Sequence, residues 1–485
     1  MKQRRLVGID LGVTSWHTVV ICDETGEVLA RRRALPTKDS LEAIAAVALH
    51  GLDDGFVLEV IIEPTGMSWF PVAVFFIERG HVVYRVSSAK SADARKLLSR
   101  QAKTNSIDAE ALARLPIIDR RGVIPLELPR GDHATLRRRV RAADRVAYSC
   151  ARQKQRIREL ARVAMPTVGN VFTGEIARTD LDVLERWADP RNLIELGEER
   201  LAFFISLQSK GQLNGDVRAA AWIRAAQAAI DLYGDSDAVP FDDIAADIAS
   251  QIRLLRAAQV ELKAHAEARE AAYLACDPEG LARSVPGVFI TGGPIVVAAI
   301  GRAGRFRNAA AFKSYTGLTP RTSETGDIDR KGQSMSRAGA DWLRAQLIRS
   351  ATSARQVDPQ LAEIYWRQMV ERGAHHNKAT CVVAAKLAER IWIVMSRGEP
   401  YVVRDVDGRP VERAEARAII AERYKVSEEV RRRRRARKWR KAPQVLEARS
   451  EKSDARGVDK RGDLPPTTTL ASSTKAVKTV ALTAT

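Results

Sequence analysis

From Arg5 to about Pro116, short apolar runs alternate with amphipathic stretches, a pattern that predicts strands separated by helices. The run Val57–Ile62 is apolar almost throughout, as in a strand buried on both faces. The predicted strands are 6–9, 18–22, 28–33, 57–62 and 81–86, and the predicted helices are 40–49, 68–78, 91–98 and 108–115. We predict three antiparallel strands followed by two strands that are each entered through a helical crossover.

Residues 133–162 form a long predicted helix with a heptad-like apolar seam. The seam positions are Leu136, Val140, Ala143, Ala147, Cys150 and Ile157. The outer face is rich in arginine, which fits either a solvated helix face or a surface that contacts phosphates. A second long helix over 241–274 has a similar seam, so the two helices could pair as a hairpin or with another subunit.

Composition divides the remainder of the chain. Residues 278–402 read as a mainly helical globular unit, and beyond Pro443 the sequence has no aromatic residue and cannot form a core. We therefore expect four parts: an α/β domain over 1–130, a helical coiled-coil region over 131–277, a mainly α domain over 278–402, and a basic, largely disordered tail over 403–485.

Charge points to a polyanionic partner. The chain has 79 Lys and Arg residues against 60 Asp and Glu residues, a formal net charge of +19. Residues 431–485 contribute 16 basic and 5 acidic side chains, so much of the excess lies in the predicted tail. Nucleic acid is the expected partner, with the arginine-rich run 431–441 as a flexible, sequence-independent contact.

Several classes of protein are excluded by the sequence. The four cysteines lie far apart without a C-x-x-C pair, which argues against a zinc ribbon or a disulfide framework and favours a reducing cytoplasm. No stretch approaches the ~18 consecutive apolar residues of a membrane-spanning helix. We expect a cytoplasmic protein that neither spans a membrane nor is secreted.

Two predicted strands end in a carboxylate beside residues that break the strand. Asp10 lies between Gly8 and Gly12, and Glu63 is followed by Pro64. Such an aspartate suits a metal-binding residue of a ribonuclease-H-like nuclease, the phosphate loop of an actin-like ATPase, or a simple turn cap. Two acids at neighbouring strand ends can face one divalent cation, and Mg²⁺ prefers such hard oxygen ligands.

A third candidate lies where a helix is predicted to begin. Asn105 and Asp108 are three residues apart and share one face of that helix. The alternative is local: Asn105 or Ser106 caps the helix, and Asp108 occupies its favourable first turn. Glu59 and Glu110 read as surface charges.

These acids form part of a longer series of motifs. Their order is Asp10, Glu63, Lys103-Thr104-x-x-x-Asp108-Ala109, then Val285-Pro286-Gly287-Val288 and Tyr315-x-Gly317-Leu318-x-Pro320. In order and spacing the series resembles the insertion-sequence-110 family of DEDD-type transposases, which are similar also to the pilin-gene invertase. The resemblance covers about residues 5–116 and 280–400.

The resemblance implies a RuvC-like, ribonuclease-H-like N-terminal domain whose acids bind Mg²⁺ or Mn²⁺, and a C-terminal transposase domain with a nucleophilic serine. The implied metal ligands are Asp10, Glu63, Asp108 and position 105, where Asn105 replaces the usual acid. The implied activity is site-specific recombination of DNA, at element ends and a target, directed by a structured bridge RNA. We expect a homodimer or homotetramer.

The position of the nucleophile is ambiguous. Strict spacing aligns Thr325 with the usual serine, whereas Ser323 lies two residues earlier. We favour Ser323 because a primary hydroxyl is less hindered, with Ser334 and Ser336 as further candidates. Activation of a serine hydroxyl by the metal site would require the helical section to fold back or to pair with a partner.

Other functions stay open at this stage. A metal-dependent nuclease or junction resolvase would use the same acids with water as the nucleophile. An actin-like ATPase would use the glycines around Asp10, and a decayed transposase that only binds DNA is suggested by the neutral Asn105. Pro286-Gly287-Val288 could open a helix-hairpin-helix that grips a phosphate, or could be an ordinary turn.

Overall fold

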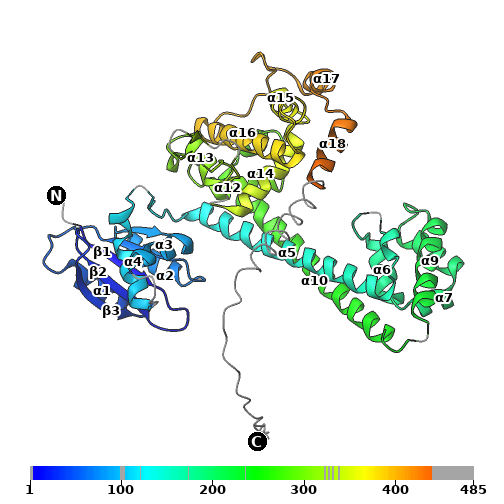
Figure 1. Cartoon of the computed structure of the whole chain (residues 1–485), viewed down its shortest axis with the longest axis horizontal. Helices are drawn as coiled ribbons and strands as arrows, with labels where there is room; N and C mark the ends of the chain where they lie inside the picture. Colours follow the sequence, from blue (N-terminus) through cyan, green and yellow to red (C-terminus); the bar gives the residue numbers. More distant parts are fainter. Residues whose placement is uncertain are drawn as a thin grey trace, which may run out of the picture. The chain divides into compact units, whose positions relative to one another are not determined.

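The computed structural model describes residues 4–98, 104–120, 122–172, 174–234, 236–321, 324–325, 328–329, 333–336 and 339–439. The chain divides into two compact units, Met1–Arg138 and Arg139–Thr485. Figure 1 shows the helices and strands of the chain. Among the described residues, no helix has both the length and the apolar character that crossing a membrane requires.

The first unit is built around a five-stranded mixed sheet. Its elements are β1 (Leu6–Asp10), β2 (His17–Cys22), β3 (Val28–Ala34), α1 (Lys38–Leu49), β4 (Glu59–Ile62), α2 (Trp69–Glu78), β5 (Val82–Arg85), α3 (Ser88–Leu98) and α4 (Asn105–Ile118). The strand order is β3-β2-β1-β4-β5. The first three strands are antiparallel, and β4 and β5 continue the sheet in parallel with β1. The mixed α/β sheet predicted from the sequence is thus confirmed.

The two sides of the sheet are covered by different helices. Val7 and Ile9 of β1 join a buried cluster with residues of α1 and α2. Leu6 belongs to a cluster on the other side, with Ala109 and Ala113 of α4. Successive side chains of a strand point to opposite faces, so Leu6, Gly8 and Asp10 of β1 face α4.

A glycine lets α4 lie directly against β1. A Cβ atom at Gly8 would stand 2.0 Å from the carbonyl oxygen of Ala109 and 2.4 Å from the amide nitrogen of Ala113. Arg114, further along α4, donates a 2.9 Å hydrogen bond to the carbonyl of Gly26 in the turn between β2 and β3. That turn adjoins the Leu6 end of β1, so α4 runs antiparallel to β1 and begins near the Asp10 end.

Both edges of the sheet are protected from further pairing. The edge strand β3 carries three consecutive exposed arginines, Arg31, Arg32 and Arg33. At the opposite edge, the chain segment after α4 pairs with β5 through a bridge between Tyr84 and Pro125. The amide of Leu126 also donates a 2.7 Å hydrogen bond to the carbonyl of Val83 in β5.

Two long helices and a bundle of shorter ones follow in the chain, and all of them except the residues before Arg139 belong to the second unit. They are α5 (Gly131–Ala164), η1 (Val168–Asn170), α6 (Arg178–Trp187), α7 (Pro190–Leu196), α8 (Glu198–Gln208), α9 (Gly215–Tyr233) and α10 (Phe241–Cys276). Figure 1 shows α5 and α10 side by side, and Cys150 and Ile157 share a buried cluster with Ile248 and Leu255. The two seams therefore pair with each other as a helical hairpin, although the predicted seam residue Ala147 is exposed.

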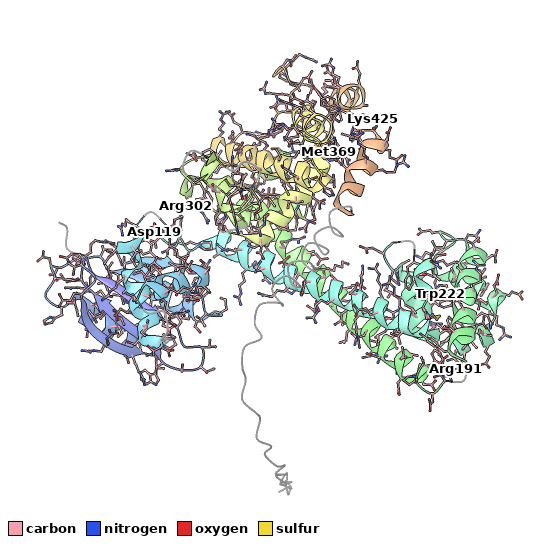
Figure 2. All side chains as sticks on the ribbon, viewed as in Figure 1. Asp119, Arg191, Trp222, Arg302, Met369 and Lys425 are labelled. Carbon is pink, nitrogen blue, oxygen red and sulfur yellow. The ribbon has the colours of Figure 1, made fainter. Side chains whose placement is uncertain are left out.

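The shorter helices pack against the end of this hairpin and share one buried core with it. Trp222 of α9 is fully buried there (Figure 2). Arg218 of α9 donates to Asp180 of α6 at 2.5 Å, and the aspartate is 1% exposed. An ion pair this buried stabilises only while both partners are present, so it fixes the position of α6 against α9.

The C-terminal part of the second unit is mainly helical. It contains α11 (Leu281–Ser284), α12 (Gly292–Ile300), η2 (Ala303–Arg305), α13 (Ala309–Tyr315), β6 (Glu324–Thr325), β7 (Ile328–Asp329), α14 (Asp341–Ala354), α15 (Pro359–Trp366), the π-helical η3 (Arg367–Glu371), α16 (His376–Arg397), α17 (Arg413–Arg423) and α18 (Glu428–Trp439). The helix α16 is central and buries Val383, Leu387 and Ile391.

The prediction of a largely disordered tail from residue 403 needs correction for residues 403–439. This segment contains α17 and α18, and Ala416 and Ile419 of α17 are buried. Arg434 of α18 donates a 3.3 Å hydrogen bond to the carbonyl of Met369. A few buried apolar side chains thus hold this segment in place, although its average composition is polar. Residues 440–485 lie outside the described part of the chain.

Candidate active site

Asp10 and Glu63 lie at neighbouring strand ends. Asp10 is the last residue of β1, and Glu63 directly follows β4. The two strands are parallel, with Ile9 opposite Ile62, so the next position on each strand carries an acid. Both residues are half-buried. The chain thus brings two carboxylates, more than 50 residues apart in sequence, to the same end of the sheet, where β1 and β4 finish.

The two acids also belong to the side of the sheet that α4 covers. Asp10 follows Gly8 by two residues on the α4 face of β1, and Glu63 follows Ile61, which packs in a buried cluster with Leu112 of α4. Because α4 begins near the Asp10 end of β1, its first turn lies at the same edge.

The first turn of α4 is capped by a residue that the sequence did not suggest. The hydroxyl of Thr104 accepts a 3.2 Å hydrogen bond from the amide of Ile107. The prediction that Asn105 or Ser106 caps this helix is therefore wrong. Asn105 is exposed and Asp108 is half-buried in the first turn, where the positive end of the helix dipole favours a carboxylate.

The carboxylate of Asp108 is paired with a cation. Arg95 of α3 donates to it at 3.2 Å, with side chains 23% and 15% exposed. Within the described residues, no three His, Cys, Asp or Glu side chains lie close enough together to hold a metal ion. The donors at the ends of these strands are hard oxygens that suit Mg²⁺ or Mn²⁺, and a cation bound by Asp108 would compete with Arg95, which donates to Oδ1 of that carboxylate.

Glu59 and Glu110 differ from their predicted role as surface charges. Glu59 is 9% exposed and accepts hydrogen bonds from Arg4 and Arg120. Burial opposes its ionisation, but the hydrogen bonds from Arg4 and Arg120 outweigh this cost and lower its pKa. Glu110 pairs with Arg31 and Arg114. Both acids therefore form ion pairs with arginines of the first unit.

Sequence reasoning missed Arg95 altogether. Its partner lies 13 residues away on another helix, and no periodic or motif signal connects the two positions.

The candidate nucleophiles lie in a loop whose base is held by backbone hydrogen bonds. The amide of Arg321 donates to the carbonyl of Ser334, and the amide of Ser336 donates to the carbonyl of Thr319, both at 2.9 Å. Thr325 lies in β6, paired with Ile328 of β7. Ser323 lies outside the described residues. Ser334 and Ser336 are engaged through their backbones at the base of this loop.

Gly287, in the candidate helix-hairpin-helix, lies directly against another helix. Gly287 has a φ of +78°, and a Cβ atom there would stand 2.2 Å from the carbonyl oxygen of Ser350 in α14. Only glycine tolerates both the conformation and the close approach. Two large apolar residues of this turn, Phe289 and Ile290, are exposed, and Thr291 separates them from α12.

Comparison with known proteins defines the class of this chain as a transposase. A family model described as "Transposase" matches residues 7–166, and one described as "Transposase IS116/IS110/IS902 family" matches residues 280–366. The two matches cover both the sheet with its acids and the beginning of the C-terminal helical part.

A curated relative supports the same assignment over most of the chain. The "Insertion element IS900 uncharacterized 42 kDa protein" of Mycobacterium paratuberculosis is 25% identical over 406 residues, which is 81% of this chain and 96% of the relative. The chain belongs to the IS110 family of transposases, enzymes that bind DNA and cut and join its strands during transposition of an insertion sequence.

Proposed function

We propose that this transposase is a metal-dependent, RNA-guided recombinase that moves its insertion sequence through a covalent protein–DNA intermediate. The first unit would act as a RuvC-like, ribonuclease-H-like catalytic domain, and the C-terminal part of the second unit would supply the nucleophile. The observation that carries the proposal is that β1 and β4 end, and α4 begins, at the same end of the sheet.

Asp10, Glu63 and Asp108 would hold the catalytic cation through carboxylate oxygens, with the amide oxygen of Asn105 as a neutral fourth ligand. A bound Mg²⁺ or Mn²⁺ would supply Lewis-acid polarisation of a phosphodiester. Because asparagine replaces an acid, the site carries one negative charge fewer than four carboxylates would. The positive charge of Arg95, which is paired with Asp108, would oppose a cation at this site.

The nucleophile proposed is the hydroxyl of Ser323, with Thr325 as the alternative. Its oxygen forms a bond to phosphorus, its proton passes to solvent, and the bond from phosphorus to the 3′ oxygen breaks. The 3′ oxygen leaves with a proton as a hydroxyl. The phosphodiester energy is retained in the phosphoserine, so a 3′ hydroxyl on a partner strand can reverse the reaction without ATP. A homodimer or homotetramer would supply the four strand cleavages of an exchange.

The competition between Arg95 and a cation gives a direct prediction. Replacement of Arg95 by alanine is expected to tighten Mn²⁺ binding by about tenfold, because it frees Asp108 and removes a repelling charge nearby. Isothermal titration calorimetry of the full chain measures the affinity. The matched control is Lys96→Ala, which removes the same charge from an exposed neighbour. Unchanged or weaker binding in Arg95→Ala would show that Asp108 is not a ligand.

Reconstitution tests the function as a whole. Purified protein, a plasmid carrying the element ends, a target plasmid and the transcript of the noncoding DNA beside the gene are combined with Mg²⁺. We expect recombined junctions, detected by sequencing, that disappear when the transcript or the cation is omitted. Junctions formed without the transcript would exclude RNA guidance, and cleavage that leaves only free 5′ phosphates would identify a hydrolytic nuclease instead.

A further inference from the structure

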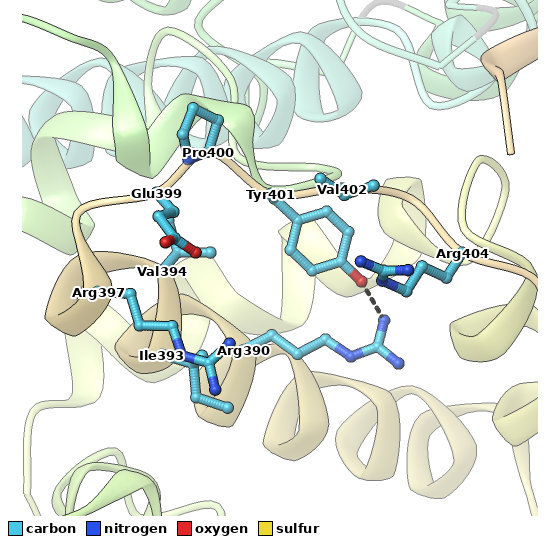
Figure 3. Close-up of a pocket in the computed structure, with 9 residues that line it drawn as sticks. All are labelled: Arg390, Ile393, Val394, Arg397, Glu399, Pro400, Tyr401, Val402 and Arg404. Carbon is cyan, nitrogen blue, oxygen red and sulfur yellow. Dashed lines mark hydrogen bonds between the residues drawn. The ribbon is translucent and has the colours of Figure 1, made fainter. Parts of the chain in front are cut away.

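The C-terminal helical part contains an open hollow at the end of α16. Nine residues line it, and they include Arg390, Arg397, Glu399, Tyr401 and Arg404 (Figure 3). Its volume is about 190 Å³. Pockets for drug-sized ligands or nucleotide cofactors are typically ~300–1,000 Å³, so this hollow fits a smaller group.

One of its arginines is part of the scaffold. Arg390 donates to both carboxylate oxygens of Asp358, at 3.1 and 3.0 Å, and Asp358 is fully buried. Arg390 also donates to the hydroxyl oxygen of Tyr401, which in turn donates to Asp358 at 2.6 Å. Burial, and then the charge of Asp358, raises the pKa of Tyr401, which keeps its hydroxyl a donor. This network holds one wall of the hollow in place. The positive charge of Arg390 in that wall is balanced by Asp358.

The other two arginines keep most of their donors available. Arg397 has no hydrogen-bond or ion-pair partner among the described residues. Arg404 donates one N–H to the carbonyl of Gly408 at 3.0 Å, which leaves four of its five guanidinium donors. A tight turn holds Arg404 in place, because Asp405 and Arg409 pair through their backbones and Gly408 has a φ of +92°.

We infer that this hollow binds a single phosphodiester group of a nucleic-acid strand, through Arg397 and Arg404. Guanidinium groups match phosphate oxygens in geometry and charge, and the hollow has room for one such group. Glu399 also lines the hollow, and its carboxylate would be repelled by the phosphate. The inference rests on the proposed function, since it assigns one contact of the nucleic acid on which that function acts.

Salt-dependent binding of the full chain tests the inference. Labelled DNA and RNA strands of one sequence are titrated by fluorescence anisotropy at several salt concentrations. Arg397→Ala and Arg404→Ala should each lower the slope of log affinity against log salt by about one, and weaken binding about fivefold. Glu399→Gln should strengthen binding. A change with RNA alone, or with DNA alone, identifies which strand supplies the phosphate.

The control is Arg417→Ala, which removes one charge from the exposed face of α17 outside the hollow. Slopes in the two pocket variants that match this control, or a Glu399→Gln protein that binds no better than wild type, would overturn the inference and leave the proposed function standing. A wild-type protein that binds neither strand would overturn both. Thermal melting verifies that each variant is folded.

Discussion

Replacement of Asp10 by asparagine is expected to lower the rate of strand cleavage by about a thousandfold or more while nucleic-acid binding persists. A metal-binding carboxylate contributes several kcal/mol of transition-state stabilisation, and each ~1.4 kcal/mol corresponds to a factor of ten in rate. Asparagine has nearly the same shape, so the end of β1 should keep its pairing with Thr18. Cleavage of a plasmid bearing the element ends, followed on gels, measures the rate.

The matched control for this experiment is Asp93→Asn, an exposed acid of α3 whose carboxylate is 76% accessible. It should cleave like the wild type. Full activity in Asp10→Asn would show that Asp10 takes no part in strand cleavage. Asn105→Asp offers the reverse comparison, because a restored fourth carboxylate would raise activity at low Mg²⁺ if position 105 is a ligand.

Replacement of Ser323 by alanine is expected to abolish covalent protein–DNA adducts. The adduct is a phosphoester of the nucleophilic oxygen, so removal of that oxygen leaves no route to it. DNA binding should be unchanged, since one hydroxyl contributes little to a contact dominated by phosphates and arginines. Denaturing gels of labelled DNA after incubation with the full chain reveal the adduct.

Thr325→Ala is the informative counterpart, because it removes the other candidate hydroxyl from the same loop. Adducts that persist in Ser323→Ala and disappear in Thr325→Ala would make Thr325 the nucleophile. Adducts that persist in both variants would turn attention to Ser334 and Ser336, and their complete absence from the wild type would favour hydrolysis by water.

The sheet was predictable from sequence because its signal is local. Ile61 and Ile62 are both fully buried, on opposite faces, which is why their strand reads as a continuous apolar run. The antiparallel start and the parallel additions followed from the lengths of the connections. The placement of Asp10 and Glu63 at strand ends could be read in the same way.

The electrostatic partners could not be predicted, because they are non-local. Arg95 meets Asp108 only after two helices pack, and Glu59 is neutralised by Arg4 and Arg120 from either end of the unit. The same holds for α18, where Arg434 reaches the carbonyl of Met369 across 65 positions. The composition of the chain showed that these residues are charged, but not which side chains or carbonyls they contact.

The two protected edges of the sheet have a consequence for assembly. Unpaired strand edges invite pairing with a second chain and aggregation, above all where copies of a DNA-binding protein are crowded on one stretch of DNA. The exposed Arg32 and Arg33 of β3 disfavour pairing with a second copy of that strand, and the segment at Pro125 and Leu126 occupies the edge at β5. Addition of a strand from another copy is thus disfavoured at both edges, even at high local concentration on DNA.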